Sequence, residues 1–439
     1  MQRIIIENFG PIQHLDLEIK DLSLFIGEQA TGKSTVAKLI YFFKSLRDEL
    51  ELYLYDRTPI ADNLIEDFVY NKIHATFNVM FSAFKPNTQN FNIIFKYTDT
   101  RFIQVQTRIQ NTLGVSIVNT EGEGQDSTEM KEICRDIEKF RDQYFSKETV
   151  LVDSSEKQKN KFDQLLDLQR IKKRIDDFFS YDGEILFTPA NRSLLAIFPD
   201  HLQAIYSNDF DSLTAAFLRR IATLKPALNQ PLKELIKELS FSKKNIPNQK
   251  VIQLSLEKIE LVLKGEYRIG NSGEERIYFD EKSYIKLSMA SSGQQEAVWI
   301  LMQIFLLLLN REKVFLVIEE PEAHLSPEAQ KSVVELITLL LKENGSQVLI
   351  TTHSPYILTA FNNLIYAGNV GKEHPEEVGK IIPPQLWIDS EQVGAYKLRA
   401  GTSEDLMDRE TKLIRAEELD SVSQSINQAF DAILNLELQ

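Results

Sequence analysis

Residues Ile26 to Thr35 read IGEQATGKST, and they fit the pattern G-x-x-x-x-G-K-[ST] without a mismatch. The apolar run Leu22–Ile26 before them predicts a buried strand, and the residues from Thr35 to Ile40 predict the first turns of a helix. Between a strand and a helix, the backbone N–H groups of such a loop and the helix N-terminus can point at phosphate oxygens. The stretch therefore predicts a nucleoside triphosphate site in an α/β fold.

Each fixed residue of this pattern has a distinct chemical role. Gly27 and Gly32 let the loop turn tightly, and Lys33 adds positive charge beside the β- and γ-phosphates. Ser34 would offer its hydroxyl to Mg²⁺. The other expected nucleotide-binding positions are Glu28, Gln29, Ala30, Thr31 and Thr35. A glycine-containing turn without function is the alternative, and four fixed positions in the right context make it the weaker one.

Composition narrows the class of protein. The 439 residues are 43% hydrophobic, enough for one large domain or two ordinary ones. A net charge of −14 argues against coating nucleic acid by bulk electrostatics. The densest basic patch, Arg170–Arg174, is flanked by acids and favours a solvated helix face, so DNA binding is left open but not indicated.

Cellular location follows from the same reading. The longest apolar run, Val298–Leu309, is too short to span a bilayer, and the N-terminus lacks an apolar secretory signal. We therefore expect a cytoplasmic chain with no membrane association. The single cysteine, Cys134, excludes an internal disulfide and is expected to be an inert thiol on a helix.

The chain divides into four expected segments. Residues 1–126 would form an N-terminal lobe that carries the phosphate loop and an antiparallel side sheet. Strands are predicted on either side of Gly10–Pro11, and then at Ile73–Phe81, Phe91–Tyr97, Arg101–Ile109 and Gly114–Asn119. Residues 127–250 would form an inserted, mainly helical module, from which the strand 185–188 returns to the body. Residues 251–390 would complete the ATPase lobe, and residues 391–439 would form a helical tail.

A second apolar strand carries acids at its carboxyl end. The run Val314–Ile318 predicts a buried strand, and Glu319 and Glu320 follow it, where open α/β sheets place their chemistry. Glu319 would hold Mg²⁺, and Glu320 would act as general base on the attacking water. A charged turn after a strand is the structural alternative.

A third strand end repeats this arrangement with a histidine. Val348–Thr352 predicts a strand, and His353 follows it directly. Beside a γ-phosphate, a histidine can donate a hydrogen bond to the transferred phosphoryl group and sense its loss. We therefore expect His353 to be functional.

Small polar residues precede a strongly apolar helix predicted over Ala297–Leu309. In the stretch SMASSGQQE, Ser288–Glu296, the Ser291 hydroxyl and the Gly293 amide could bind an anion at the helix N-terminus. Taken alone, the stretch is more typical of a helix cap than of a site.

The order of these four pieces resembles the ABC-type ATPase heads of SMC-like and overcoming-lysogenization-defect (OLD) proteins. The resemblance implies a P-loop NTPase fold of the ABC ATPase-head type, with a mixed central sheet, an antiparallel side sheet and an inserted helical module. It places Ser291, Ser292, Gly293 and Gln294 at the family's signature, which acts in trans on a second head. It also implies that Glu320 is the catalytic glutamate, that Pro321–Pro327 is a dimer-contacting D-loop and that His353 is the switch histidine. Glu319 stands where the family has aspartate.

Further likeness lies outside the motifs. ENFGPI near the start, TPANRS at Thr188–Ser193 and the tail from Leu413 look like stand-alone ATPase subunits of bacterial anti-phage systems of the PARIS or Septu type. This implies an ATP- and Mg²⁺-dependent homodimer or higher homo-oligomer that regulates a separate effector, such as a TOPRIM or HNH nuclease. The alternatives are an ATP-stabilised scaffold with little turnover, an SMC-like repair ATPase and a transporter subunit.

Two features have open interpretations. The apolar positions between Glu417 and Leu436 recur at helical spacing and would pack on the body or on another subunit. Arg192, in the PANRS turn, would be a salt-bridged turn residue or a contact to phosphate or to another subunit.

Overall fold

The structure is a computed structural model of the 439-residue chain. It describes residues 1–58, 63–82, 90–107, 112–119, 128–145, 154–193, 211–242, 248–270, 273–343, 345–415, 428 and 430. These residues form two compact units. Unit 1 comprises Met1–Ile19, Ser34–Leu186 and Ala400–Ser403, and unit 2 comprises Lys20–Lys33, Phe187–Arg399 and Glu404–Gln439.

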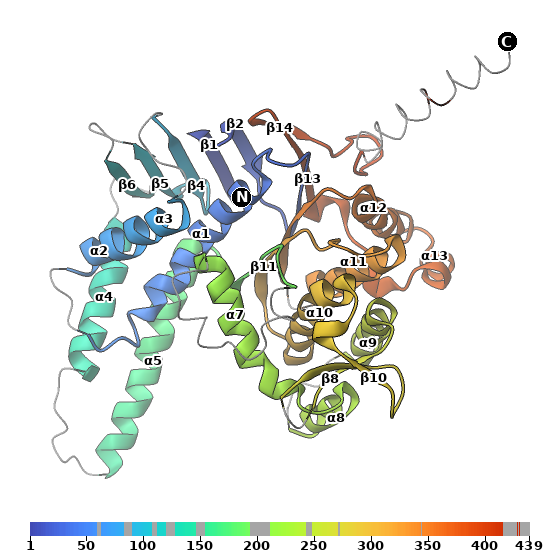
Figure 1. Cartoon of the computed structure of the whole chain (residues 1–439). Helices are drawn as coiled ribbons and strands as arrows, with labels where there is room; N and C mark the ends of the chain where they lie inside the picture. Colours follow the sequence, from blue (N-terminus) through green and yellow to red (C-terminus); the bar gives the residue numbers. More distant parts are fainter. Residues whose placement is uncertain are drawn as a thin grey trace. The chain divides into compact units, whose positions relative to one another are not determined.

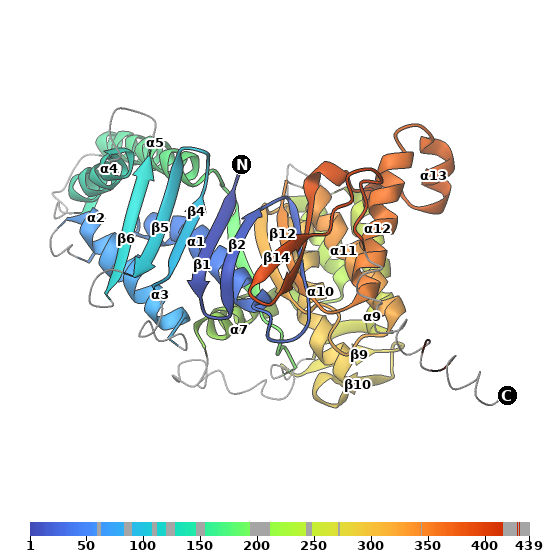
Figure 2. The same ribbon diagram turned by 90° about the horizontal axis from the view of Figure 1, so that it is seen from above.

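Unit 1 is built on a five-stranded sheet of order β2-β1-β4-β5-β6, whose strands lie side by side in Figure 2. Its strands are β1 (Arg3–Phe9), β2 (Ile12–Glu18), β4 (Asn92–Lys96), β5 (Arg101–Thr107) and β6 (Leu113–Asn119). All the pairings are antiparallel. The turn at Gly10–Pro11 joins β1 to β2, which confirms the predicted hairpin and side sheet.

The helices of unit 1 bury one face of this sheet (Figure 1). The long helix α1 (Lys33–Leu52) stacks Phe43 on Phe95 of β4 with ring centroids 5.3 Å apart, and the Tyr97 hydroxyl donates to the Phe43 carbonyl at 2.6 Å. The remaining helices are α2 (Leu64–Asp67), a π-helix (Phe68–His74), α3 (Ala75–Met80), α4 (Thr128–Phe145) and α5 (Ser154–Phe179).

The predicted strand at Ile73–Phe81 is wrong, because these residues are helical. The buried positions Ile73, Phe77 and Phe81 recur every four residues, which is the spacing of one helix face. Phe77 and Phe81 pack on each other with centroids 4.8 Å apart, and Phe77 lies 5.4 Å from Phe42 of α1. An aromatic cluster on a helix face therefore replaces the expected strand.

The second sheet is six-stranded and mixed, of order β14-β13-β3-β12-β11-β7, and its four strands from β13 to β11 belong to unit 2. Its strands are β3 (Leu22–Ile26), β7 (Glu184–Thr188), β11 (Val314–Glu319), β12 (Gln347–Thr352), β13 (Val393–Arg399) and β14 (Thr402–Asp405). Strand β3 runs parallel to both β12 and β13, and β12 runs parallel to β11. Because all five residues of β3 are buried, the strand before the phosphate loop lies inside this sheet.

Helices and a second small sheet complete unit 2 (Figure 1). The helices are α7 (Ser212–Leu224), α8 (Leu232–Ser242), α9 (Gln249–Leu263), α10 (Ser292–Asn310), α11 (Pro327–Lys342), α12 (Pro355–Val370) and α13 (Pro375–Ile381). Strands β8 (Glu266–Ile269), β9 (Glu275–Tyr278) and β10 (Tyr284–Lys286) form an antiparallel sheet of order β10-β9-β8. Within the described part of the chain, α10 alone is long and apolar enough to cross a membrane, and 83% of that window is buried, as in the core helix of a folded unit.

Strands β13 and β14 lie in the segment that was expected to be a helical tail, so that expectation is wrong for residues 393–405. Gly394 inside β13 obscures the strand pattern, since glycine weakens strands and usually marks a break. The predicted amphipathic helix between Glu417 and Leu436 lies outside the described residues, apart from positions 428 and 430.

Candidate active site

The loop between β3 and α1 has the backbone that its sequence requires. Gly27, Ala30 and Gly32 have positive φ angles of +150°, +61° and +97°. A β-carbon on Gly27 would lie 2.4 Å from the Leu398 carbonyl oxygen of β13, so no larger residue fits there. Glycine is the residue that adopts such angles without steric cost. The loop is therefore a closely packed turn that needs glycine at position 27.

Lys33 is held inside this loop. Its Nζ donates to the carbonyl oxygens of Gly27 at 2.9 Å and Glu28 at 2.7 Å. An ammonium group has three donors, so one remains for a phosphate oxygen. Burial lowers the pKa of Lys33, while the charges of Glu320 and Glu322 act in the opposite direction.

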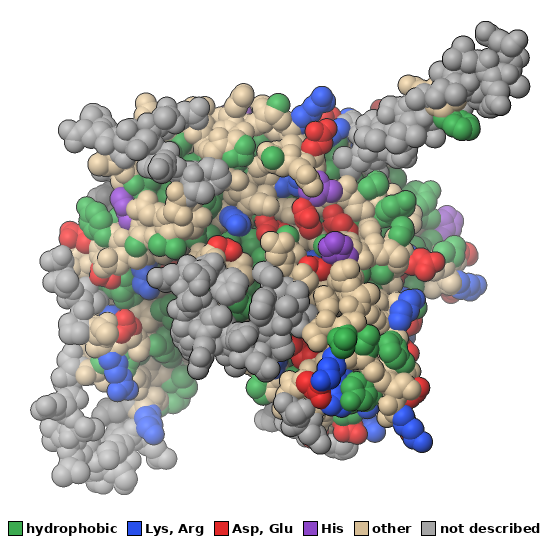
Figure 3. All heavy atoms as spheres, in the orientation of Figure 1, with side chains coloured by type: hydrophobic (Ala, Val, Ile, Leu, Met, Phe, Trp, Pro, Cys, Tyr) green, Lys and Arg blue, Asp and Glu red, His purple; other side chains and the backbone are tan. Residues whose placement is uncertain are grey.

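The parallel sheet brings the three predicted strand ends together. Thr352 at the end of β12 is paired with Ile26, directly before the loop, and Glu319 at the end of β11 is paired with Thr351. The carboxyl ends of parallel strands meet at one edge of a sheet. Glu319, Glu320, His353 and the phosphate loop up to Lys33 therefore lie at one edge of unit 2. Acidic and histidine side chains gather on the face of the molecule shown in Figure 3.

Glu320 and His353 contact each other directly. His353 Nε2 lies 2.9 Å from Glu320 Oε1, and the two side chains are 30% and 39% exposed, respectively. Glu320 has a positive φ of +44°, and its amide donates to the Thr351 carbonyl at 2.9 Å. A non-glycine residue in this region is held there by its surroundings, and such residues cluster at functional sites. The expected base and the expected phosphate sensor thus form one pair.

Glu322 belongs to the same site, although the sequence analysis did not identify it. Its Oε1 accepts hydrogen bonds from the Thr352 hydroxyl at 2.6 Å and from the His353 amide at 2.7 Å. It therefore fixes the backbone that carries His353. In the sequence, Glu322 stands two residues after Glu320, and this position indicated only that it belongs to the expected D-loop.

Arg192 is buried inside unit 2, with 1% of its surface exposed. It forms a salt bridge with Glu296 of α10, with Nε and Oε2 3.4 Å apart. It also donates to two backbone carbonyls at the end of β11, those of Glu319 and Glu320. Burial lowers the pKa of Arg192, against the charges of Glu296 and three further glutamates. Of the expected alternatives, the structure places Arg192 in a salt-bridged turn.

The signature segment caps α10. The Ser291 hydroxyl accepts from the Gln294 amide at 3.4 Å, and the Ser291 amide donates to Gln294 Oε1 at 3.1 Å. A β-carbon on Gly293 would lie 2.6 Å from the His324 carbonyl oxygen, so the signature packs against the D-loop of the same chain. Ser291 and Ser292 are exposed. The capping box is present; Gly293 is buried and Gln294 Nε2 donates to the Leu263 carbonyl at 2.6 Å, so only the two serines lie at the surface.

The side chains expected to bind magnesium, those of Ser34 and Glu319, suit an ion that takes most of its ligands from water and phosphate. Among the described residues, no group of three or more His, Cys, Asp or Glu side chains could hold a metal ion. The Ser34 hydroxyl is exposed and the Glu319 carboxylate is 6% exposed. Two buried oxygens nearby, Thr351 Oγ1 and Glu322 Oε2, have no hydrogen-bond partner within the described part of the chain. Mg²⁺ keeps waters and phosphate oxygens beside one or two protein ligands, which such a set allows.

A phosphate loop between a buried strand and a helix, with acids and a histidine at neighbouring strand ends, defines a P-loop NTPase. The α/β fold class expected from the sequence, with a mixed central sheet and an antiparallel side sheet, is confirmed. The chain belongs to the AAA ATPase domain family, which matches residues 1–358. No curated protein sequence matches it.

Solved structures with a similar chain path include ATPase heads. The SMC head bound to the C-terminal winged-helix domain of ScpA has a TM-score of 0.42 and 10% identity, over 92% of this chain and 95% of that one. The SMC head domain from Thermotoga maritima has a TM-score of 0.37 and 12% identity, over 92% and 97%. The recombination mediator RecF has a TM-score of 0.30 and 13% identity, also over 92% and 97%. These likenesses are too distant to assign an activity.

Proposed function

We propose that the chain hydrolyses ATP to ADP and phosphate, with Glu320 as the general base and His353 as the γ-phosphate sensor. The contact between His353 Nε2 and Glu320 Oε1 carries this proposal. It lies at the sheet edge that also holds the phosphate loop up to Lys33. A nucleotide whose phosphates lie in the loop would thus have its γ-phosphate beside the pair.

The chemistry follows from the two side chains. With a nucleotide bound, His353 Nε2 would turn its one N–H from Glu320 Oε1 to a γ-phosphoryl oxygen, and the freed Glu320 Oε1 would accept a proton from the attacking water. Lys33 Nζ, already held by two loop carbonyls, offers its third proton to the same phosphate. Ser34 and Glu319 would hold Mg²⁺, which supplies positive charge that neutralises the phosphates. No acceptor other than water is required.

The site is proposed to be shared between two copies of the chain. Residues 27–34 of one copy would face Ser291, Ser292, Gly293 and Gln294 of the other, so that two ATP molecules hold two heads together. Ser291 and Ser292 are exposed at the N-terminus of α10, where helix N–H groups favour phosphate. A homodimer is the smallest assembly that completes both sites.

Mixing two inactive variants tests the shared site. Lys33→Ala disables the phosphate loop, and Ser292→Arg blocks the signature without removing the Ser291 cap. A mixed dimer contains one site with both halves intact, so we expect the mixture to regain up to about a quarter of the wild-type rate of phosphate release. If each chain hydrolysed ATP alone, Ser292→Arg would remain active by itself.

We further propose that ATP turnover in this chain regulates a separate effector, in the manner of the anti-phage ATPases whose motifs it resembles. An effector nuclease of TOPRIM or HNH type would be supplied by another chain. An ATP-stabilised scaffold is the second candidate, and the contact between the partly exposed His353 and Glu320 side chains makes turnover the better supported one. Co-purification of an effector with ATP, and its release on adding phage protein or DNA, would test the role. An assembly unaffected by ATP would contradict it.

A further inference from the structure

Arg192 makes more directed contacts than a surface salt bridge needs. Its Nη1 donates to the carbonyl oxygens of Pro189 and Glu319, both at 2.7 Å, and its Nη2 donates to the Glu320 carbonyl at 3.0 Å. Its Nε donates to the Glu296 carbonyl at 2.9 Å. One guanidinium group therefore joins the PANRS turn, the end of β11 and the first turns of α10.

The carboxylate of Glu296, on α10, binds the backbone of the PANRS turn. Its Oε2 accepts from the Arg192 amide and its Oε1 from the Ser193 amide, both at 3.1 Å. Glu296 is 4% exposed and lies only two residues after Gln294 of the signature segment. The carboxylate thus fixes the arginine's backbone while the helix carbonyl fixes its side chain.

The carbonyls that Arg192 binds belong to the two residues that matter most for chemistry. Glu320 has a positive φ of +44°, a conformation that its surroundings must maintain. Its amide is fixed by Thr351 and its carbonyl accepts from Arg192. A buried guanidinium with five donors in a rigid fork can hold several carbonyls at once, which an ammonium cannot do with the same geometry.

We propose that Arg192 is a positioning residue that links the Glu320 turn to the signature end of α10. Hydrolysis then depends on Arg192, while nucleotide binding does not. This inference rests on the proposed ATPase function. Arg192 touches neither the phosphate loop nor the Glu320 carboxylate in any described contact, so its effect passes through the backbone.

The test compares Arg192→Lys with the wild-type chain in two measurements. Steady-state phosphate release should show kcat lowered about 10- to 100-fold, with the affinity for a fluorescent ATP analogue changed less than about threefold. Hydrogen exchange of peptides that span 316–323 should increase about tenfold or more, because the turn loses its support. The exchange measurement requires no turnover.

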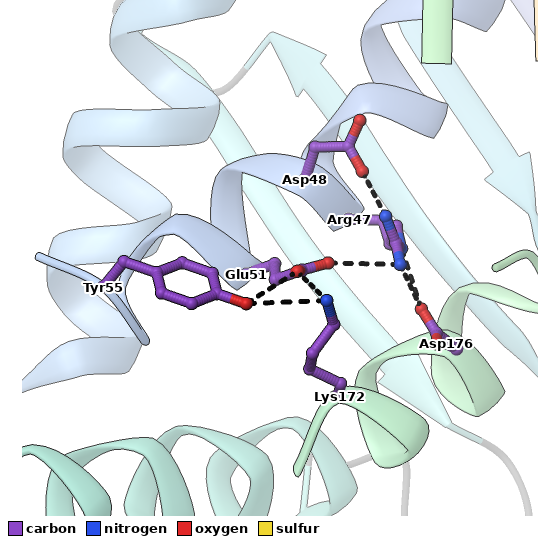
Figure 4. A network of polar contacts seen from close by, with 6 residues as sticks. All are labelled: Arg47, Asp48, Glu51, Tyr55, Lys172 and Asp176. Atoms are coloured by element: carbon purple, nitrogen blue, oxygen red, sulfur yellow. Dashed lines mark hydrogen bonds and ion pairs between the residues drawn. The ribbon is translucent and has the colours of Figure 1, made fainter. Parts of the chain in front are cut away.

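Arg47→Lys is the matched control. Arg47 lies in unit 1, is 8% exposed and bonds Asp176 through two nitrogens at 2.8 and 2.6 Å, in the ionic network of Figure 4. Arg47→Lys makes the same chemical change at a largely buried arginine of unit 1. We expect a lowered melting temperature with kcat and exchange at 316–323 near wild type.

Each outcome decides one point. The proposal is overturned if Arg192→Lys keeps kcat within about twofold of wild type, or if exchange rises equally throughout the chain. Should Arg192→Lys fail to fold, Glu296→Gln, which leaves the guanidinium in place, is judged by the same two criteria. A wild-type chain without ATPase activity would contradict the proposed function, whereas the exchange data would still decide whether Arg192 holds the turn.

Discussion

His353 Nε2 lies 2.9 Å from Glu320 Oε1, although 32 residues lie between the two in the sequence. Each follows the end of its own parallel strand, β12 for the histidine and β11 for the glutamate. The sheet therefore fixes the pair before any ligand arrives. A base and a hydrogen-bond donor held this close can act on the two ends of one reaction, the water and the phosphoryl group.

Glu320→Gln should lower the rate of ATP hydrolysis about 100-fold or more, because an amide cannot accept the proton of the attacking water. Nucleotide affinity should stay near wild type, since the loop and Lys33 are unchanged. Phosphate release and binding of a fluorescent ATP analogue measure the two effects. Turnover near the wild-type rate would remove Glu320 from the role of base.

His353→Ala should lower kcat about 100-fold while leaving nucleotide binding largely intact, because one donor to the γ-phosphoryl group is lost. His374→Ala is the control, since His374 is an exposed residue directly before α13. It should keep wild-type kinetics. Equal effects of the two substitutions would show that His353 has no special role.

Gly27→Ala should weaken the affinity for nucleotide at least about tenfold. The φ angle there is +150°, and the added carbon would lie 2.4 Å from the Leu398 carbonyl oxygen. Gly379→Ala places its carbon in ordinary contact, 3.7 Å from Pro384, and serves as the matched control. Isothermal titration with ATP and Mg²⁺ distinguishes the two. Wild-type affinity in Gly27→Ala would place the nucleotide elsewhere.

Ser292→Arg, combined with Glu320→Gln, should prevent dimerisation in the presence of ATP. The Glu320→Gln chain alone should accumulate as an ATP-bound dimer, because it binds but does not hydrolyse. Ser292 is exposed and a different residue, Ser291, caps the helix, so the melting temperature should change little. Light scattering with and without ATP reports the mass. A dimer that persists with arginine at position 292 would contradict the shared site.

Cys134 should react slowly with thiol reagents in the folded chain. Burial, with the nearby charge of Glu138, raises the pKa of its thiol to about 12. Only about one thiol in ten thousand is then ionised at pH 8, and the thiolate is the reactive form. The folded pKa lies above that of the unfolded chain, so this thiol makes the protein less stable as pH rises above about 9. Ellman's reagent should react quickly only in denaturant; fast reaction without denaturant would mean that α4 opens.

Much of the site was predictable because its signals are local. The phosphate loop, the two acids after β11 and the histidine after β12 each follow an apolar run directly, so strand ends can be recognised from neighbouring residues. What could not be predicted depends on contacts between distant segments. Nothing in the letters PANRS indicates that Arg192 reaches carbonyls 127 and 128 residues away.

The secondary structure was likewise predictable where its signals are local and not where it depends on distant contacts. The hairpin β1–β2 and strands β4–β6 alternate in two-residue steps and were predicted. Ile73–Phe81 was misassigned because its aromatic residues suit a strand by composition, while their four-residue spacing suits the helix that packs on α1. Strand β13 was missed because its place inside the sheet is set by β3, which precedes it by about 370 residues.

The position of β13 has a practical consequence for shortened versions of this protein. The family match ends at residue 358. Strand β13, which follows that point, pairs with the whole of β3, from Leu22 to Ile26. A recombinant fragment cut at the family boundary would expose an unpaired edge of the strand that leads into the phosphate loop. It would also lack the Leu398 backbone on which Gly27 rests. An expression plasmid for crystallisation should therefore extend at least to residue 405, the end of β14.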